Sequence, residues 1–276
     1  MRIAFISDIH GNLTALQAVL ADLEQQKADL VISLGDVVTL GPQPAEVLTT
    51  LRGLGCICIS GNHDEAVLDP ERAAELQIAD HLVPDLFWGR SKLSVSDLEF
   101  IRSFQANHKF TFPNGTSVLC FHGSPFSSTD LILSTTPNEE LDRFLNGRSA
   151  DVYIGGHSHI QMHRRHGDKL VLNSGSVGNA FTRAYQPGIP PKLLPWAEYA
   201  VLDQNGQALE VELRRVPLST SEVLSRSIDP YGPSWLNRCS ADKVPEELML
   251  IVFQEACPDL CQNLNGSSRN KRARNP

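Results

Sequence analysis

Near its beginning the chain reads Ile3-Ala-Phe-Ile-Ser-Asp8-Ile-His10-Gly11-Asn12, and its later motifs repeat the same design. The apolar residues predict a strand buried on both faces, because Ile and Phe fit a covered, pleated sheet. Asp8 and His10 follow two positions apart, so both side chains point to one side. A carboxylate and an imidazole at the carboxyl end of a strand resemble half of a metal site, although Asp-x-His also occurs in ordinary loops.

The composition is that of a globular protein with a substantial core. The 276 residues are 41% hydrophobic and 20% charged, which allows one large α/β domain or two small ones. The net charge of −8 argues against a protein that coats nucleic acid, but not against a small anionic substrate. The sequence has neither an apolar run of about 18 residues nor a signal-peptide pattern, and its six cysteines form no disulfide scaffold. We therefore expect a cytoplasmic protein without membrane association.

Two further strands are predicted, each after a helix and each ending in polar residues. They are Leu30–Leu34, which ends in Gly35-Asp36, and Cys56–Ser60, which ends in Gly61-Asn62-His63-Asp64. The intervening helices run to Gln26, with Asn12 or Thr14 as the cap, and from Pro44 to Leu54. Parallel strands joined by helices place all these strand ends at one edge of a sheet.

Other elements are predicted over the rest of the chain. Helices are expected at Glu71–Ala79, Pro84–Ser91, Val95–Phe104 and Asn138–Leu145, and a strand at Val152–Ile154. Hairpins should pair Lys109–Phe112 with Ser117–Phe121, Met162–His166 with Leu170–Leu172, and Glu198–Leu202 with Leu209–Arg215. Gln186–Trp196 has four prolines and predicts an irregular loop near the site. We expect a domain over residues 1–216, a helical extension over 217–262 with helices at Ser219–Ser227 and Pro245–Cys257, and a disordered basic tail over 263–276.

Acids, histidines and one asparagine recur where the predicted strands end. They are Asp8, His10, Asp36, Asn62, His63, His122, His157 and His159. Oxygen and imidazole ligands without thiolate suit Mn, Fe, Zn, Co or Ni. Seven ligands suit two ions that share a carboxylate, and two ions about 3.5–4 Å apart promote in-line displacement at phosphorus by an attacking hydroxide. His63 is not needed as a ligand and could protonate the leaving group.

Taken together, these blocks resemble the signature of the calcineurin-like metallophosphoesterases. The blocks are Asp8-x-His10, Gly35-Asp36, Gly61-Asn62-His63-Asp64, His122-Gly123 and Gly156-His157-Ser-His159. The resemblance covers residues 1 to about 216. It is strongest to the small single-domain prokaryotic phosphodiesterase branch, which carries a block similar to Asn173–Val177. It implies an α/β fold, a four-layer α/β/β/α sandwich of two mixed sheets flanked by helices.

The resemblance also implies a role for each residue and two divalent metal ions, with manganese expected and Fe, Ni, Zn or Co as alternatives. Asp8, His10 and His159 would bind the first ion, Asn62, His122 and His157 the second, and Asp36 both. His63 would be the catalytic histidine, and Asp64 would orient it. Asn12 and Asn173 would lie near the substrate phosphate.

One departure from the family bears on the substrate. The protein-phosphatase branch has Asp-Arg-Gly after its Gly-Asp block, whereas Val37-Val-Thr-Leu-Gly41 here contains no arginine. A phosphomonoester carries an extra charge for such an arginine, so its absence favours phosphodiesters, although Arg183 could compensate. We expect a small phosphoester substrate, nucleotides among the candidates. The alternatives are a phosphomonoesterase or protein phosphatase, and a non-catalytic metal-binding scaffold, which would have no use for His63.

Overall fold

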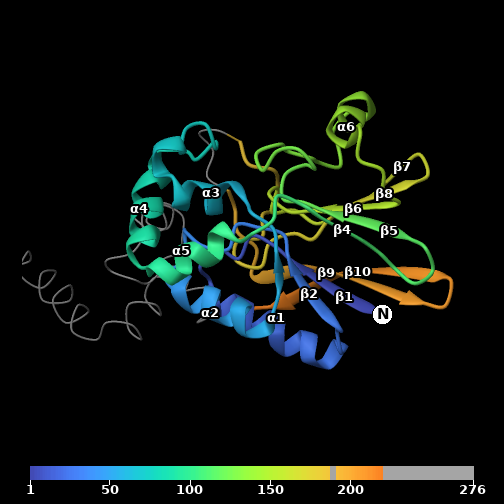
Figure 1. The fold of residues 1–276 in the computed structure, drawn as a ribbon, viewed down its shortest axis with the longest axis horizontal. Coiled ribbons are helices and arrows are strands. Elements are labelled where there is room, and N and C mark those ends of the chain that lie inside the picture. The colour runs from blue at the N-terminus through green and yellow to red at the C-terminus, as the bar shows by residue number, and fades with distance from the viewer. Residues whose placement is uncertain (187–190, 220–276) are drawn as a thin grey trace, which may run out of the picture. The chain divides into compact units, whose positions relative to one another are not determined.

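The computed structural model describes residues 1–186 and 191–219, which form a mixed α/β fold with two five-stranded sheets (Figure 1). None of the helices in these two ranges is long and apolar enough to cross a membrane. The predicted helices at Ser219–Ser227 and Pro245–Cys257, the extension beyond residue 219 and the basic tail lie outside the described residues. The proposed division into residues 1–216, 217–262 and 263–276 stays a prediction.

The first sheet has the strand order β10-β9-β1-β2-β3. Its strands are β1 (Arg2–Ile6), β2 (Leu30–Ser33), β3 (Ile57–Cys58), β9 (Trp196–Asn205) and β10 (Ala208–Pro217). The first three run parallel, with Ile3 opposite Leu30 and Ile32 opposite Ile57. The hairpin of β9 and β10 pairs antiparallel with the other side of β1.

The second sheet has the order β4-β5-β6-β8-β7. Its strands are β4 (His108–Thr111), β5 (Ser117–Cys120), β6 (Val152–Gly155), β7 (Met162–His166) and β8 (Lys169–Asn173). The three central strands β5, β6 and β8 are parallel, and each edge strand closes an antiparallel hairpin. All three predicted hairpins are therefore present.

Helices surround the two sheets (Figure 1). They are α1 (Leu13–Gln26), α2 (Pro44–Leu54), α3 (Asn62–Leu68), α4 (Val83–Ser91), α5 (Val95–Arg102) and α6 (Asn138–Leu145). Helices α1 and α2 lie over the outer face of the first sheet, α6 over that of the second, and α3, α4 and α5 beyond one end of the strands (Figure 1). Helices α1 and α2 pack on the first sheet, through buried residues such as Leu16 and Leu48, and α6 packs on the second through Leu141 and Leu145. Asn12 caps α1 as predicted, because its side-chain oxygen accepts a hydrogen bond from Ala15 N.

The alternation of side chains along β1 explains how one strand serves two cores. Ile3 and Phe5 point into the apolar layer between the sheets, where they meet residues of the second sheet such as Val118 and Ile154. Ala4 and Ile6 belong to the core beneath α1 and α2. Because successive side chains of a strand face opposite sides, the continuous apolar run fits a strand covered on both faces. The predicted four-layer sandwich is confirmed.

Three local predictions differ from the structure. The expected helix Glu71–Ala79 is absent: a 3₁₀ turn at Pro70–Arg72 and irregular turns take its place, and a second 3₁₀ turn follows at Asp80–Leu82. Gln77 ends this stretch with a left-handed φ of 57°. The helix α3, which begins at Asn62, was not expected. The strand predicted at Cys56–Ser60 is confined to Ile57–Cys58.

Candidate metal centre

The polar residues of the strand ends lie together at one edge of both sheets. The loop after β1 runs beside the loop after β2, with hydrogen bonds from Asp8 N to Gly35 O (2.9 Å) and from His10 N to Asp36 O (3.0 Å). The backbone of Gly178 donates to Asp8 O on the other side, and Gly156 N donates to His122 O. Hydrogen bonds between loops thus continue the sheets beyond their strands and fix the side chains that the loops carry.

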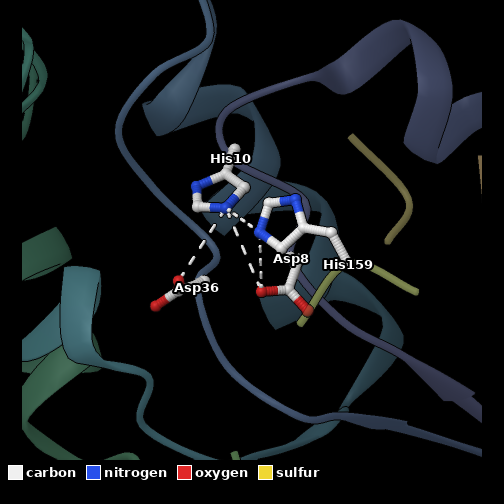
Figure 2. A group of neighbouring side chains, drawn as sticks. All are labelled: Asp8, His10, Asp36 and His159. Carbon is white, nitrogen blue, oxygen red and sulfur yellow. Dashed lines mark hydrogen bonds and ion pairs between the residues drawn. The ribbon is translucent and has the colours of Figure 1, made fainter. Parts of the chain in front are cut away.

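One group of ligand atoms comes from Asp8, His10, Asp36 and His159 (Figure 2). His10 Nε2 lies 3.1 Å from His159 Nε2, 3.8 Å from Asp36 Oδ2 and 4.0 Å from Asp8 Oδ1, and His159 Nε2 lies 3.2 Å from Asp8 Oδ1. Atoms that share an ion at about 2.1 Å lie between about 3.0 Å apart when adjacent and about 4.2 Å when opposite. All four distances are compatible with a single ion.

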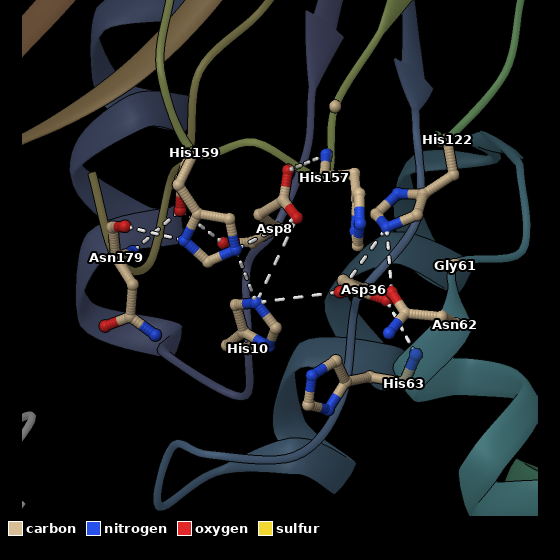
Figure 3. Close-up of polar contacts among 12 residues, drawn as sticks. Asp8, His10, Asp36, Gly61, Asn62, His63, His122, His157, His159 and Asn179 are labelled. Atoms are coloured by element: carbon tan, nitrogen blue, oxygen red, sulfur yellow. Dashed lines mark hydrogen bonds and ion pairs between the residues drawn. The ribbon is translucent and has the colours of Figure 1, made fainter. Parts of the chain in front are cut away.

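A second group consists of Asp36, His122 and His157 (Figure 3). His122 Nε2 is 3.4 Å from Asp36 Oδ2 and 3.3 Å from the side-chain oxygen of Asn62. The amide nitrogen of Asn62 donates to Leu76 O (2.9 Å), which turns its oxygen toward His122. Asp36 is therefore common to both groups, as the bridging role requires.

Backbone carbonyls orient two of the rings. His159 Nδ1 lies 2.7 Å from Asn179 O, and His122 Nδ1 lies 2.8 Å from Leu34 O. A carbonyl oxygen can only accept, so each Nδ1 must carry a proton, and each Nε2 can offer its lone pair to a metal. The arrangement is the usual support of a metal-binding histidine.

Burial and unmet polar atoms also fit a cation at this centre. Asp8, His10, Asp36 and His122 are at most 1% exposed. Among the described residues, Asp8 Oδ1 has no hydrogen-bond partner of good geometry, although it faces the first group of ligands. A buried carboxylate oxygen without a partner is costly unless a cation meets it. The donor set of the two groups therefore fits divalent metal ions.

The charge balance of the protein alone is unusual. Burial by itself would raise the pKa of Asp8, but His159 holds it at about 2. Burial would lower the pKa of His122, yet Asp36 raises it to about 10. Burial lowers the pKa of His157 to about 4. The pKa of His159 is raised as well, because Asp8 outweighs the effect of burial, so the carboxylates favour a proton on two of the rings.

Five of the seven predicted ligands have a left-handed backbone. Their φ angles are 53° at Asp8, 49° at His10, 54° at Asp36, 65° at His157 and 57° at His159. Residues other than glycine adopt this region uncommonly, and it costs about 1–3 kcal/mol each. Such strain gathers where function over-determines the backbone, and here it turns successive side chains toward one point.

The environment of Asp64 corrects one prediction. Its carboxylate accepts hydrogen bonds from the backbone N–H groups of Asp36, Val37, Val38 and Gly61. It therefore fixes the loop after β2 rather than the ring of His63. That ring contacts Thr39 instead, with Oγ1 of Thr39 2.9 Å from Nδ1. The backbone N of His63 donates to Asp36 Oδ1 (2.9 Å), so the histidine is tied to the predicted bridging residue.

The three residues predicted to meet the substrate phosphate have different surroundings. Asn173 Nδ2 donates to Gly156 O and to Ser158 Oγ, and its oxygen accepts from Gly175 N, so its amide is fully used within the protein. It braces the loop of His157 and His159, and its place near the substrate phosphate stays a prediction. Asn12 caps α1 and donates to Gly178 O. Arg183 is exposed.

Sequence reasoning missed Thr39, the carbonyls of Leu34, Leu76 and Asn179, and the bracing role of Asn173. Backbone carbonyls leave no trace in residue identity, and a threonine in a loop is not informative by itself. Asn179 follows the Asn173–Val177 block closely, which is the one signal available. The predicted ligands, in contrast, all lie at the centre.

Comparison with known proteins agrees with this geometry. Residues 1–188 match a family model described as the calcineurin-like phosphoesterase superfamily domain. An uncharacterised protein of Methanocaldococcus jannaschii is 28% identical over 243 residues, which cover 85% of this chain and 95% of that protein.

Two solved structures have a similar fold. A hypothetical protein from Pyrococcus horikoshii is 22% identical, with a TM-score of 0.67 and coverage of 91% of this chain and 97% of that one. A metallophosphoesterase from Sphaerobacter thermophilus is 23% identical, with a TM-score of 0.61 and coverage of 91% and 98%. These likenesses establish the fold of the chain.

Proposed function

The chain belongs to the calcineurin-like phosphoesterase superfamily, and from that premise we propose that it hydrolyses phosphodiesters with two divalent metal ions. The observation that carries the proposal is the position of Asp36 in both groups of ligand atoms. A single bridging carboxylate is the expected link between two ions a few ångströms apart.

Each group of residues has a defined part in this proposal. Asp8, His10 and His159 would hold one ion, Asn62, His122 and His157 the other, and Asp36 both. Manganese is the ion we expect, with Fe, Ni, Zn and Co as alternatives, because the ligands are oxygen and imidazole atoms. When bound, the ions would neutralise the phosphoryl oxygens and activate the attacking water.

His63 is the residue that we assign to the leaving group. Its backbone is tied to Asp36, so the ring lies next to the centre, and the ring centroid is 5.1 Å from that of His10. Its side chain is only 8% exposed, which keeps the ring in a defined position. Burial lowers its pKa, so the protonated ring is a stronger acid than an exposed imidazolium. A proton donated from His63 would leave with the departing alcohol.

The surroundings of the centre favour diesters over monoesters. The loops 8–12, 36–41, 61–64, 122–124, 156–160 and 173–179 contain no lysine or arginine. A monoester carries one more negative charge than a diester, and a fixed guanidinium usually meets that charge. Arg183 follows the last of these loops and is exposed. These loops thus offer ligands for metal ions but no fixed cation for the additional charge.

The test is a metal-by-substrate panel. Protein freed of metal with a chelator is loaded with Mn, Fe, Co, Ni or Zn and assayed with bis(p-nitrophenyl) phosphate and with p-nitrophenyl phosphate. We expect metal-dependent turnover, faster on the diester. A preference for the monoester would refute the substrate class, and no turnover with any of the five metals would favour a non-catalytic metal-binding protein.

A further inference from the structure

Thr39 is a buried residue in the loop after β2 whose side chain meets His63. Its Oγ1 lies 2.9 Å from Nδ1 of the His63 ring, and Thr39 is 0% exposed. The contact is the one hydrogen bond that the ring makes with the described residues. Nε2 is therefore the ring nitrogen left for a substrate.

The backbone at Thr39 lies in the left-handed region. Its φ is 77°, and Leu40 follows with 62°. For a β-branched residue a positive φ is a true outlier, and such outliers persist where the surroundings impose them. A glycine or asparagine would relieve the strain, but neither carries a hydroxyl on a rigid Cβ.

The loop that presents Thr39 is itself fixed at two sides. Val37 N and Val38 N donate to Asp64 Oδ1, and Val37 O accepts from Gly11 N (2.8 Å). Asp64 follows His63 directly in the chain. Asp64 therefore fixes the loop after β2, and its neighbour His63 contacts the hydroxyl of Thr39 in the same loop.

We propose that Thr39 is the positioning residue of His63, holding Nδ1 so that Nε2 faces the leaving group; this inference rests on the proposed function. A hydroxyl can donate to a neutral ring and accept from a protonated one, so the bond survives the transfer of a proton. The Thr39 hydroxyl adds no charge beside the ring, whereas a carboxylate in its place would stabilise the imidazolium. Thr39 acts through His63 and does not touch the substrate.

Kinetics with a series of leaving groups test the proposal. Thr39→Val removes the hydroxyl and keeps the branched shape, Thr39→Ser keeps the hydroxyl, and Thr49→Val is a matched control on the exposed face of α2. With a diester of a poorly acidic alcohol, we expect Thr39→Val to lose roughly 10-fold in kcat, the worth of one good hydrogen bond. With p-nitrophenolate, which leaves without a proton, the loss should be about 2-fold or less. Thr39→Ser should recover most of the rate.

A double variant separates positioning from simple packing. If Thr39 acts through His63, Thr39→Val should cost nothing further in the His63→Gln background. An equal loss with all leaving groups, or full additivity with His63→Gln, would assign Thr39 to structure alone and overturn the proposal. If Thr39→Val does not fold, Thr39→Ala serves in the same comparison.

A spectroscopic measurement keeps the inference separate from the proposed function. The ¹⁵N shift of His63 Nδ1, assigned with His63→Gln, should change in Thr39→Val and stay near wild-type in Thr39→Ser. An unchanged shift in Thr39→Val overturns the inference even in an active enzyme. A changed shift in a protein without turnover would support the Thr39–His63 contact while the proposed function fails.

Discussion

Asp36 and His122 form a buried pair in which Nε2 of the histidine lies 3.4 Å from Oδ2 of the carboxylate. The same carboxylate uses its other oxygen to accept a hydrogen bond from His63 N. Oδ2 is therefore the atom that faces both groups of ligands, since His10 Nε2 also lies 3.8 Å from it. The two oxygens of Asp36 thus have different partners, and the first prediction concerns this carboxylate.

Asp36→Asn should weaken the binding of both metal ions by at least about 100-fold, because an amide supplies no charge to either. Metal content after dialysis and calorimetric titration measure the loss. Asp168→Asn, in an exposed hairpin turn, is the matched control and should bind normally. A variant that loses one ion and keeps the other would contradict the bridging role.

Metal binding should release protons and strengthen as pH rises. Asp36 raises the pKa of His122 to about 10, so below that pH the metal-free ring is protonated, and the proton must leave before Nε2 can coordinate. Apparent affinity should therefore increase by up to about 10-fold per pH unit for each proton displaced, between pH 7 and 9. Calorimetry in buffers of different ionisation enthalpy measures the release. A binding enthalpy independent of the buffer would show that no proton is displaced.

His63→Ala should retain both metals and lose about 10²- to 10⁴-fold in turnover of diesters with poor leaving groups, the usual contribution of a positioned acid. Metal analysis and steady-state kinetics provide the two readings. His163→Ala is an exposed control of the same type. Turnover close to that of wild-type would remove His63 from the reaction.

Gly61→Ala should disturb the centre, because a Cβ at residue 61 would overlap Asp36 Oδ1 and the Asp36 backbone. We expect a loss of about 1–3 kcal/mol in the free energy of unfolding, together with reduced metal content. Gly53→Ala provides the contrast, since a Cβ there meets nothing within 4 Å and the residue lies inside α2. That variant should gain up to about 1 kcal/mol. Thermal unfolding measures the stability of both variants, and equal stability of Gly61→Ala and Gly53→Ala would refute the steric argument.

The sequence indicated which residues gather at the centre because their signals are local. A buried strand followed by an acid or a histidine is readable at Asp8 and Asp36, and the parallel order of strands brings such ends together. The four-layer arrangement followed from the resemblance, and the apolar run Ile3–Ile6 indicated a strand covered on both faces. The assignment of each ligand to one ion, and the number and identity of the ions, stay predictions.

The errors arose where tertiary contacts override local preference. Residues 71–79 have good helix formers, but the left-handed φ of 57° at Gln77 interrupts a helix there, and the carbonyl of Leu76 accepts from Asn62 Nδ2. Asp64 was assigned to His63 from its place in the chain, and only the fold reveals that it binds backbone N–H groups after β2. Thr39 could not be found, because its partner lies 24 residues away in the first turn of α3.

The left-handed backbone at Asp8, His10, Asp36, His157 and His159 has an evolutionary consequence. Each of these positions would be more relaxed as glycine, by about 1 kcal/mol or more, so folding alone does not maintain the residues found there. A lineage that drifted without selection for catalysis would be expected to acquire glycine or asparagine at these five positions while its strands and cores persisted. The residues found at these five positions would therefore distinguish a descendant still under selection for catalysis from one that has kept only the fold.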